Sequence, residues 1–128
     1  MDPFDFKDGD AHEPIEGLDE SLYDKVKKRF AFAKNVRLVK GYIPDSFALG
    51  CPEKIAFMHI DMNNAEAEKA ALEHRWSRVM PGGMVILDDY GWVFYGKQKE
   101  AEDILFSNNH NHLVLELPTG QGMVIKHG

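Results

Sequence analysis

Residues 18–30 carry apolar side chains at a helical spacing. The apolar positions stand four residues apart: Leu18, Leu22, Val26 and Phe30. Acidic residues come early in this segment and basic residues come late, which matches the helix dipole. We therefore predict a helix here. Residues 1–17 have few apolar anchors among Asp, Gly, Pro and Glu, which predicts an extended or mobile, lid-like segment before a domain spanning 18–128.

Two runs in the next part of the chain are typical of β-strands. The text "NVRLVKGYI" (35–43) is rich in β-branched and aromatic residues, and "PDSFALGCPE" then supplies loop residues. The text "KIAFMHID" (54–61) is almost continuously apolar, which is the pattern of a strand covered on both faces. This second strand runs directly into a carboxylate, Asp61.

A helix and a third strand follow. Asn63 or Asn64 is a candidate N-cap. Apolar residues then recur with helical spacing at Ala65, Leu72, Trp76 and Val79. The charged residues of this segment are expected on the other faces of the helix: Glu66, Glu68, Lys69 and Glu73. The "PGG" at 81–83 should end the helix before a strand from Met84 to Leu87. Strand, helix and strand make a βαβ unit, so the two strands should be parallel.

The last third of the chain predicts one more helix and a hairpin. "GKQKEAEDILFSNN" (96–109) is amphipathic through Ala101, Ile104 and Leu105. "HLVLELPTGQGMVIKHG" contains two apolar runs joined by a glycine-containing turn at 118–122. The expected fold class is therefore α/β, with a C-terminal antiparallel hairpin.

Carboxylates stand at the ends of both strands of the βαβ unit. Asp88 and Asp89 follow the second strand as Asp61 follows the first. Parallel neighbours end at the same edge of the sheet, where ligands of open α/β sheets bind. Clustered like charges need a counter-charge, and oxygen ligands favour Mg²⁺, Ca²⁺ or Mn²⁺. The alternative is that these acids cap the following loop and helix.

Composition narrows the class of protein. The chain has 128 residues, the size of one domain, and a net charge of −6, which argues against general affinity for nucleic acid or an anionic membrane. A single cysteine, Cys51, excludes an internal disulfide. No apolar run reaches the roughly 20 residues of a membrane span, and the acidic start is unlike a signal peptide. A cytoplasmic protein is the expectation.

Several stretches together resemble the macrocin O-methyltransferase (TylF/MycF-type) family of S-adenosylmethionine-dependent enzymes. They are "NVRLVKGYIPDSF", "CPEKIAFMHIDMNNAEAEKAALEHRWSRVMPGGMVILDDYGW", "GKQKEAEDIL" and "LPTGQGMVIK", and the resemblance covers roughly residues 18–126. It implies that Asp61, Asp88 and Asp89 hold a divalent metal, usually Mg²⁺, which binds neighbouring hydroxyls of a sugar-like acceptor. Family members often carry another acid where this chain has Asn63.

The resemblance and the positions of residues along the predicted strands suggest further candidate site residues. The resemblance implies that a region near the start of the chain contacts the adenine of the cofactor, namely Gly41, Tyr42, Pro44, Asp45 and Ser46. It also implies that Asp61, besides binding the metal, contacts the cofactor and takes part in catalysis. His59 lies two residues before Asp61 on one strand, so both should share a face, and it is a candidate catalytic residue against the alternative of a core histidine. Tyr90, Trp92 and Gln121 are candidates for contacting the acceptor, against packing or hairpin roles.

One expected feature of this family is missing. No glycine-rich turn follows any predicted strand, and the resemblance places the chain after the family's first two strands. The implied fold is a partial Rossmann-like methyltransferase sheet, mostly parallel, lacking those strands. Such a gap exposes backbone and apolar surface, which a rearranged sheet, a homodimer or a complementing chain could cover, and we favour the homodimer.

Three functions fit these observations. The first is an S-adenosylmethionine-dependent, Mg²⁺-assisted O-methyltransferase-like protein acting on a hydroxyl of a sugar or small natural product, inactive alone if the cofactor loop is essential. The second is a non-catalytic oligomeric binding or regulatory module derived from the same fold. The third is a metal-dependent hydrolase that uses the same acids to activate water.

Overall fold

The computed structural model describes residues 1, 4, 21–109 and 111–128. These residues form two compact units, Met1–Cys51 and Pro52–Gly128. The boundary expected after residue 17 lies outside the described residues, so it stays a prediction.

The first unit contains helix α1 (Leu22–Arg29) and a short 3₁₀ helix, η1 (Asp45–Leu49). Helix α1 confirms the described part of the helix expected over 18–30, with three basic residues in its last turn. The strand expected over 35–43 is wrong, because residues 36–39 form no regular element and Lys40 makes only an isolated β-bridge. A strand is stable only when its backbone groups pair along a ladder, and all strands of the described sheet belong to the second unit.

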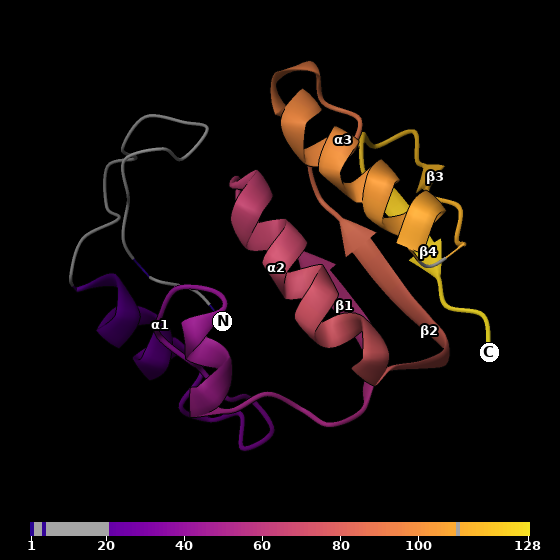
Figure 1. The fold of residues 1–128 in the computed structure, drawn as a ribbon. Coiled ribbons are helices and arrows are strands. Elements are labelled where there is room, and N and C mark those ends of the chain that lie inside the picture. The colour runs from indigo at the N-terminus through magenta and orange to yellow at the C-terminus, as the bar shows by residue number, and fades with distance from the viewer. Residues whose placement is uncertain (2–3, 5–20, 110) are drawn as a thin grey trace. The chain divides into compact units, whose positions relative to one another are not determined.

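The second unit is built on a four-stranded sheet with the order β1-β2-β4-β3 (Figure 1). Its strands are β1 (Ile55–Ile60), β2 (Val79–Leu87), β3 (Leu115–Glu116) and β4 (Gly122–Ile125). Strands β1 and β2 are parallel, and the β2–β4 and β3–β4 pairs are antiparallel. The α/β class, the parallel βαβ unit and the C-terminal hairpin are confirmed, and the sheet is mixed, with one parallel pair.

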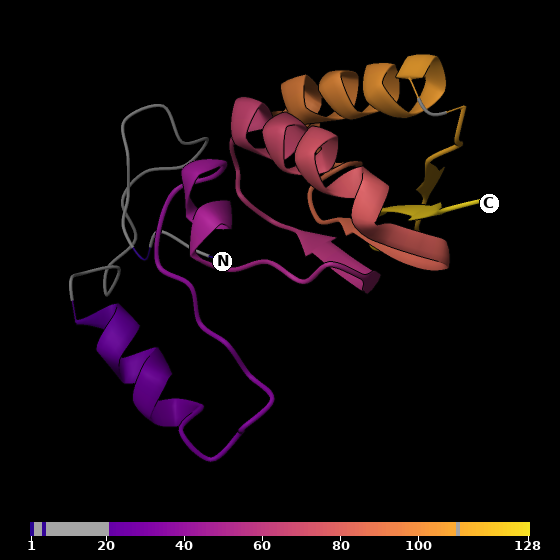
Figure 2. The ribbon, with the colours of Figure 1, turned by 60° about the horizontal axis from the view of Figure 1, so that its bottom comes forward.

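Two helices cover one face of this sheet, as Figures 1 and 2 show from two directions. Helix α2 (Ala65–Arg75) is capped by Asn64, whose side-chain oxygen accepts from Ala67 N at 3.0 Å. It ends earlier than expected, because a 3₁₀ turn, η2 (Trp76–Arg78), leads directly into β2 at Val79. The second helix follows the 3₁₀ turn η3 (Val93–Tyr95) and comprises α3 (Gly96–Ile104) and a π-helical end, η4 (Leu105–Asn109).

The core lies between the helices and one face of the sheet. Val85 and Val124 are neighbours in register and both are fully buried, as are Leu72 of α2 and Phe106 of η4. Strand residues alternate between faces, so the next positions in register point away from the helices. That opposite face, which we call the open face, carries these side chains: Phe57, His59, Met84, Ile86, Met123 and Ile125. Phe57 is 60% exposed, so the open face keeps apolar surface in contact with water.

Among the residues that the structure describes, every helix is too short or too polar to cross a lipid bilayer.

Candidate functional site

Three carboxylates meet where β1 and β2 end. Asp61 follows β1, and Asp88 and Asp89 follow β2. The parallel register pairs Ile60 with Leu87, and the backbone N–H of Asp88 donates to the carbonyl of Ile60 at 2.9 Å. One oxygen from each acid lies within 4.8 Å of the others. The cluster expected from the sequence is therefore present, and the strand register creates it.

The donor set fits a hard divalent cation. Mg²⁺ binds oxygen at about 2.1 Å in octahedral geometry, so two of its ligands stand about 3.0 Å apart when adjacent and about 4.2 Å apart when opposite. Oxygens already within 4.8 Å can reach these distances by small side-chain rotations. Asp61 is exposed and the other two acids are half-buried, which leaves one side open to water or substrate. The helix α2 is capped by Asn64 and not by Asp61, whereas capping of the loop after β2 by Asp88 or Asp89 stays an open alternative.

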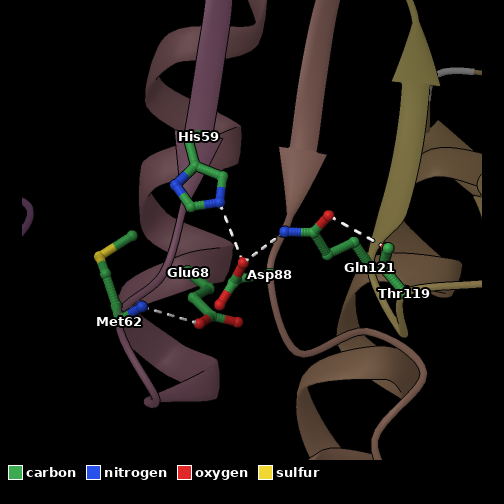
Figure 3. Close-up of polar contacts among 6 residues, drawn as sticks. All are labelled: His59, Met62, Glu68, Asp88, Thr119 and Gln121. Carbon is green, nitrogen blue, oxygen red and sulfur yellow. Dashed lines mark hydrogen bonds and ion pairs between the residues drawn. The ribbon is translucent and has the colours of Figure 1, made fainter. Parts of the chain in front are cut away.

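Asp88 is held by two further side chains (Figure 3). Nε2 of His59 lies 3.1 Å from Oδ1 of Asp88, and Nε2 of Gln121 donates to the same oxygen at 2.7 Å. His59 comes from β1, and Gln121 comes from the hairpin turn just before β4. Both residues are thus brought to the site, as the sequence predicted. Their expected roles in catalysis and acceptor binding stay predictions.

Glu68 was expected on a solvent-facing side of α2, and this expectation is wrong. Its side chain is buried, and its Oε1 accepts from the backbone N–H of Met62, the residue after Asp61, at 3.2 Å. The pKa of Glu68 is raised to about 7, mainly by burial and partly by the negative charges of Asp89 and Asp61, while the hydrogen bond from Met62 N–H lowers it. A signal was present in the sequence, because Glu68 stands at the i+3 position between Ala65 and Leu72, on the core-facing stripe.

A second buried acid, Glu102, lies on α3 and was not identified from the sequence. It is 2% exposed, and its Oε2 has no hydrogen-bond partner among the described residues. Burial raises its pKa to about 9, and the nearby charge of Glu68 is the next cause. At neutral pH the folded protein therefore holds Glu102 in its protonated form.

The two aromatic candidates differ in exposure. Tyr90 is only 5% exposed, its hydroxyl donates to Asp103 on α3, and Nζ of Lys99 lies 3.4 Å from its ring centre. Tyr90 thus ties the loop after β2 to α3 and presents little surface to a ligand. Trp92 is 55% exposed and packs over Gly120, where an added Cβ would lie 2.5 Å from the indole nitrogen. An acceptor-binding role stays a prediction for both.

The residues expected to contact the cofactor lie in the first unit, apart from Asp61. Gly41 has φ +147, and a Cβ there would lie 2.9 Å from Cβ of Ser46, so glycine permits the turn into η1. The backbone N–H of Ser46 donates to the carbonyl of Tyr42 at 2.8 Å, and Ser46 itself is 2% exposed. Tyr42 and Asp45 are exposed and accessible to a ligand. The cofactor role of these four residues stays a prediction.

Comparison with known proteins identifies the family. The family model for macrocin O-methyltransferase (TylF) matches residues 7–111. No curated protein matches the sequence significantly. A similar solved structure is that of the O-methyltransferase NovP, with a TM-score of 0.69 and 17% sequence identity, covering 82% of this chain and 45% of that one. The chain thus spans less than half the length of that structure, and at this identity the likeness shows a partial methyltransferase fold. Because the family model matches well over half of its residues, the chain belongs to the macrocin O-methyltransferase (TylF) family.

Proposed function

We propose that the chain acts as an S-adenosylmethionine-dependent, Mg²⁺-assisted O-methyltransferase on a hydroxyl of a sugar or small natural product in the cytoplasm. The observation that carries this proposal is the cluster of Asp61, Asp88 and Asp89 at the carboxyl edge of the sheet of a TylF-family chain. Oxygen ligands with an open side suit a cation that also binds substrate oxygens.

In this proposal Asp61, Asp88 and Asp89 hold the cation, and the side open to solvent admits the acceptor. A bound divalent cation lowers the pKa of a hydroxyl and fixes its position for attack on a methyl group. His59 is the candidate proton acceptor. Its ring lies beside Asp88, with Nε2 3.1 Å from Oδ1, so the imidazole is close to the site where the hydroxyl would bind.

The cofactor part of the proposal rests on family membership. The connections that follow β1 and β2 read "DMNN" and "DDYGW", and neither is the glycine-rich turn that would cradle the cofactor. The glycine-rich cradle is therefore not found in these two connections. We assign adenine contacts to Tyr42 and Asp45, which are exposed, and regard Ser46 as a structural member of that turn because it is buried.

Calorimetric titration with S-adenosylmethionine in the presence of Mg²⁺ tests this function. We expect saturable binding, because the proposal requires the chain, alone or assembled, to offer a cofactor site. Titration with S-adenosylmethionine after mixing with EDTA is the control for the cation. No detectable heat at two temperatures would contradict the proposal and favour the alternative, a non-catalytic binding module built on the same fold.

We further propose that two copies of the chain associate through the open face. Strand β1 is an edge strand of the described sheet, and the face it shares with β2 and β4 carries exposed apolar side chains. Parallel strands are normally covered on both faces, so association would remove this surface from water.

Light scattering is expected to give twice the chain mass of 14.6 kDa. Phe57→Lys should shift the mass to that of the monomer, because it places a charge among the apolar side chains of the open face. Val93→Lys is the matched control, since Val93 is 92% exposed but belongs to η3. A wild-type mass of 14.6 kDa at every concentration would rule out the dimer.

A further inference from the structure

Gln121 has a fixed amide orientation in this structure. The hydroxyl of Thr119 donates to Oε1 of Gln121 at 3.2 Å, and Nε2 of Gln121 donates to Oδ1 of Asp88 at 2.7 Å (Figure 3). The opposite orientation would place the amide oxygen against a carboxylate oxygen, which is repulsive. Gln121 can therefore serve Asp88 only as a donor.

The backbone around Gln121 is anchored to the loop that carries the acids. Gly91 N–H donates to the carbonyl of Gly120 at 2.7 Å, and Leu117 N–H donates to the carbonyl of Gln121 at 2.7 Å. The indole of Trp92 lies against Gly120, which closes the space a side chain there would occupy. The hairpin turn and the loop after β2 thus form one connected structure, so Gln121 keeps its place relative to Asp88.

Both donors to Asp88 use the same oxygen. His59 from β1 and Gln121 from the hairpin turn both reach Oδ1, and the other oxygen of Asp88 is on the far side from them in Figure 3. A carboxylate with one oxygen held by two donors keeps a single orientation and presents its other oxygen, Oδ2, for a further partner. We propose that Gln121 is a positioning residue that holds Asp88 so that its Oδ2 joins Asp61 and Asp89 around a divalent cation. This inference rests on the proposed function.

The proposal gives the β3–β4 hairpin a role in the site. Gln121 acts on the cation only through Asp88 in this proposal. Loss of the donor leaves Asp88 free to adopt other orientations, so the cation must order it on binding. We expect this to weaken cation affinity without removing it, because all three acids remain.

Titration of the intact chain with Mn²⁺, followed by electron paramagnetic resonance, tests the proposal. Gln121→Met keeps the length of the side chain and removes the donor, and its Kd for Mn²⁺ should rise about 3- to 10-fold. Thr119→Val removes only the group that orients the amide and should give a smaller rise. Thr119→Ser keeps the hydroxyl and is the matched control, with an unchanged Kd. Melting temperatures in EDTA check that the variants are folded. If Gln121→Met is not folded, Thr119→Val is used to test the proposal.

The outcomes separate the inference from the function. If the wild type binds Mn²⁺ and Gln121→Met binds it with the same Kd, Gln121 does not position Asp88, and the cation site remains. If Gln121→Met does not fold, an unchanged Kd for Thr119→Val leads to the same conclusion. Absence of Mn²⁺ binding by the wild-type chain would overturn the cation site itself, and the role of Gln121 with it.

Discussion

Replacing Asp88 with Asn is expected to weaken Mg²⁺ binding by roughly 100-fold, because it removes one of three charged ligands and disturbs its two donors. The effect can be measured as thermal stabilisation. At a Mg²⁺ concentration of about 100 times the wild-type Kd, binding stabilises the folded wild type by about 2.7 kcal/mol. The same concentration should stabilise the Asp88→Asn variant by only about 0.4 kcal/mol.

A matched control separates ligand loss from loss of charge. Glu66→Gln removes one negative charge from an exposed position on α2, outside the cluster, so its Mg²⁺ response should equal that of the wild type. Equal melting shifts for wild type, Asp88→Asn and Glu66→Gln would show that Asp88 is not a ligand. Loss of the shift in both variants would show that general charge, rather than the cluster, attracts the ion.

Replacing Glu102 with Gln is expected to stabilise the folded protein at pH 8. In the folded state the pKa of Glu102 is about 9, because its carboxyl is buried, whereas its ordinary value is 4.5. Between these values the folded state binds more protons than the unfolded state. The free energy of unfolding therefore falls as pH rises from about 4.5 to about 9, by about 1.4 kcal/mol per pH unit. Glu68 adds to this loss between 4.5 and about 7.

Glutamine stays neutral at every pH, so Glu102→Gln removes the part of the pH dependence of the free energy of unfolding that Glu102 causes. In EDTA at pH 8 the variant should be more stable than the wild type by about 5 kcal/mol, and the two should converge near pH 4.5. Urea unfolding at a series of pH values measures both curves. Glu100→Gln is the matched control, since Glu100 is exposed on the same helix. Parallel curves for wild type and Glu102→Gln would mean that Glu102 is not held protonated.

The parts of the structure that the sequence predicted share one cause. The apolar run over 54–61 and the acids after Leu87 define two strands by local pattern, and the βαβ rule then makes them parallel. Once they are parallel, Asp61 and Asp88 must meet at one edge. His59 could be placed for the same reason, since strand periodicity alone puts it near Asp61.

The parts that sequence reasoning missed depend on tertiary contacts. Glu68 and Glu102 were overlooked because charged residues are normally placed on the solvent-facing side of a helix, whereas packing of α2 and α3 over the sheet buries both. The segment 35–43 has strand-forming residues but no ladder to join among the described residues, so it stays irregular. The end of α2 at Arg75 was missed because Val79 fits the helical spacing and the strand equally well.

The most direct test of the central claim is a crystal structure of the chain grown with Mn²⁺ and measured at the manganese absorption edge. We expect one anomalous peak within roughly 2.5 Å of an oxygen from each of Asp61, Asp88 and Asp89. The same map should leave Oδ1 of Asp88 on His59 and Gln121. An ordered site without an anomalous peak, at a Mn²⁺ concentration that saturates known magnesium enzymes, would contradict the claim that these three acids form a cation site.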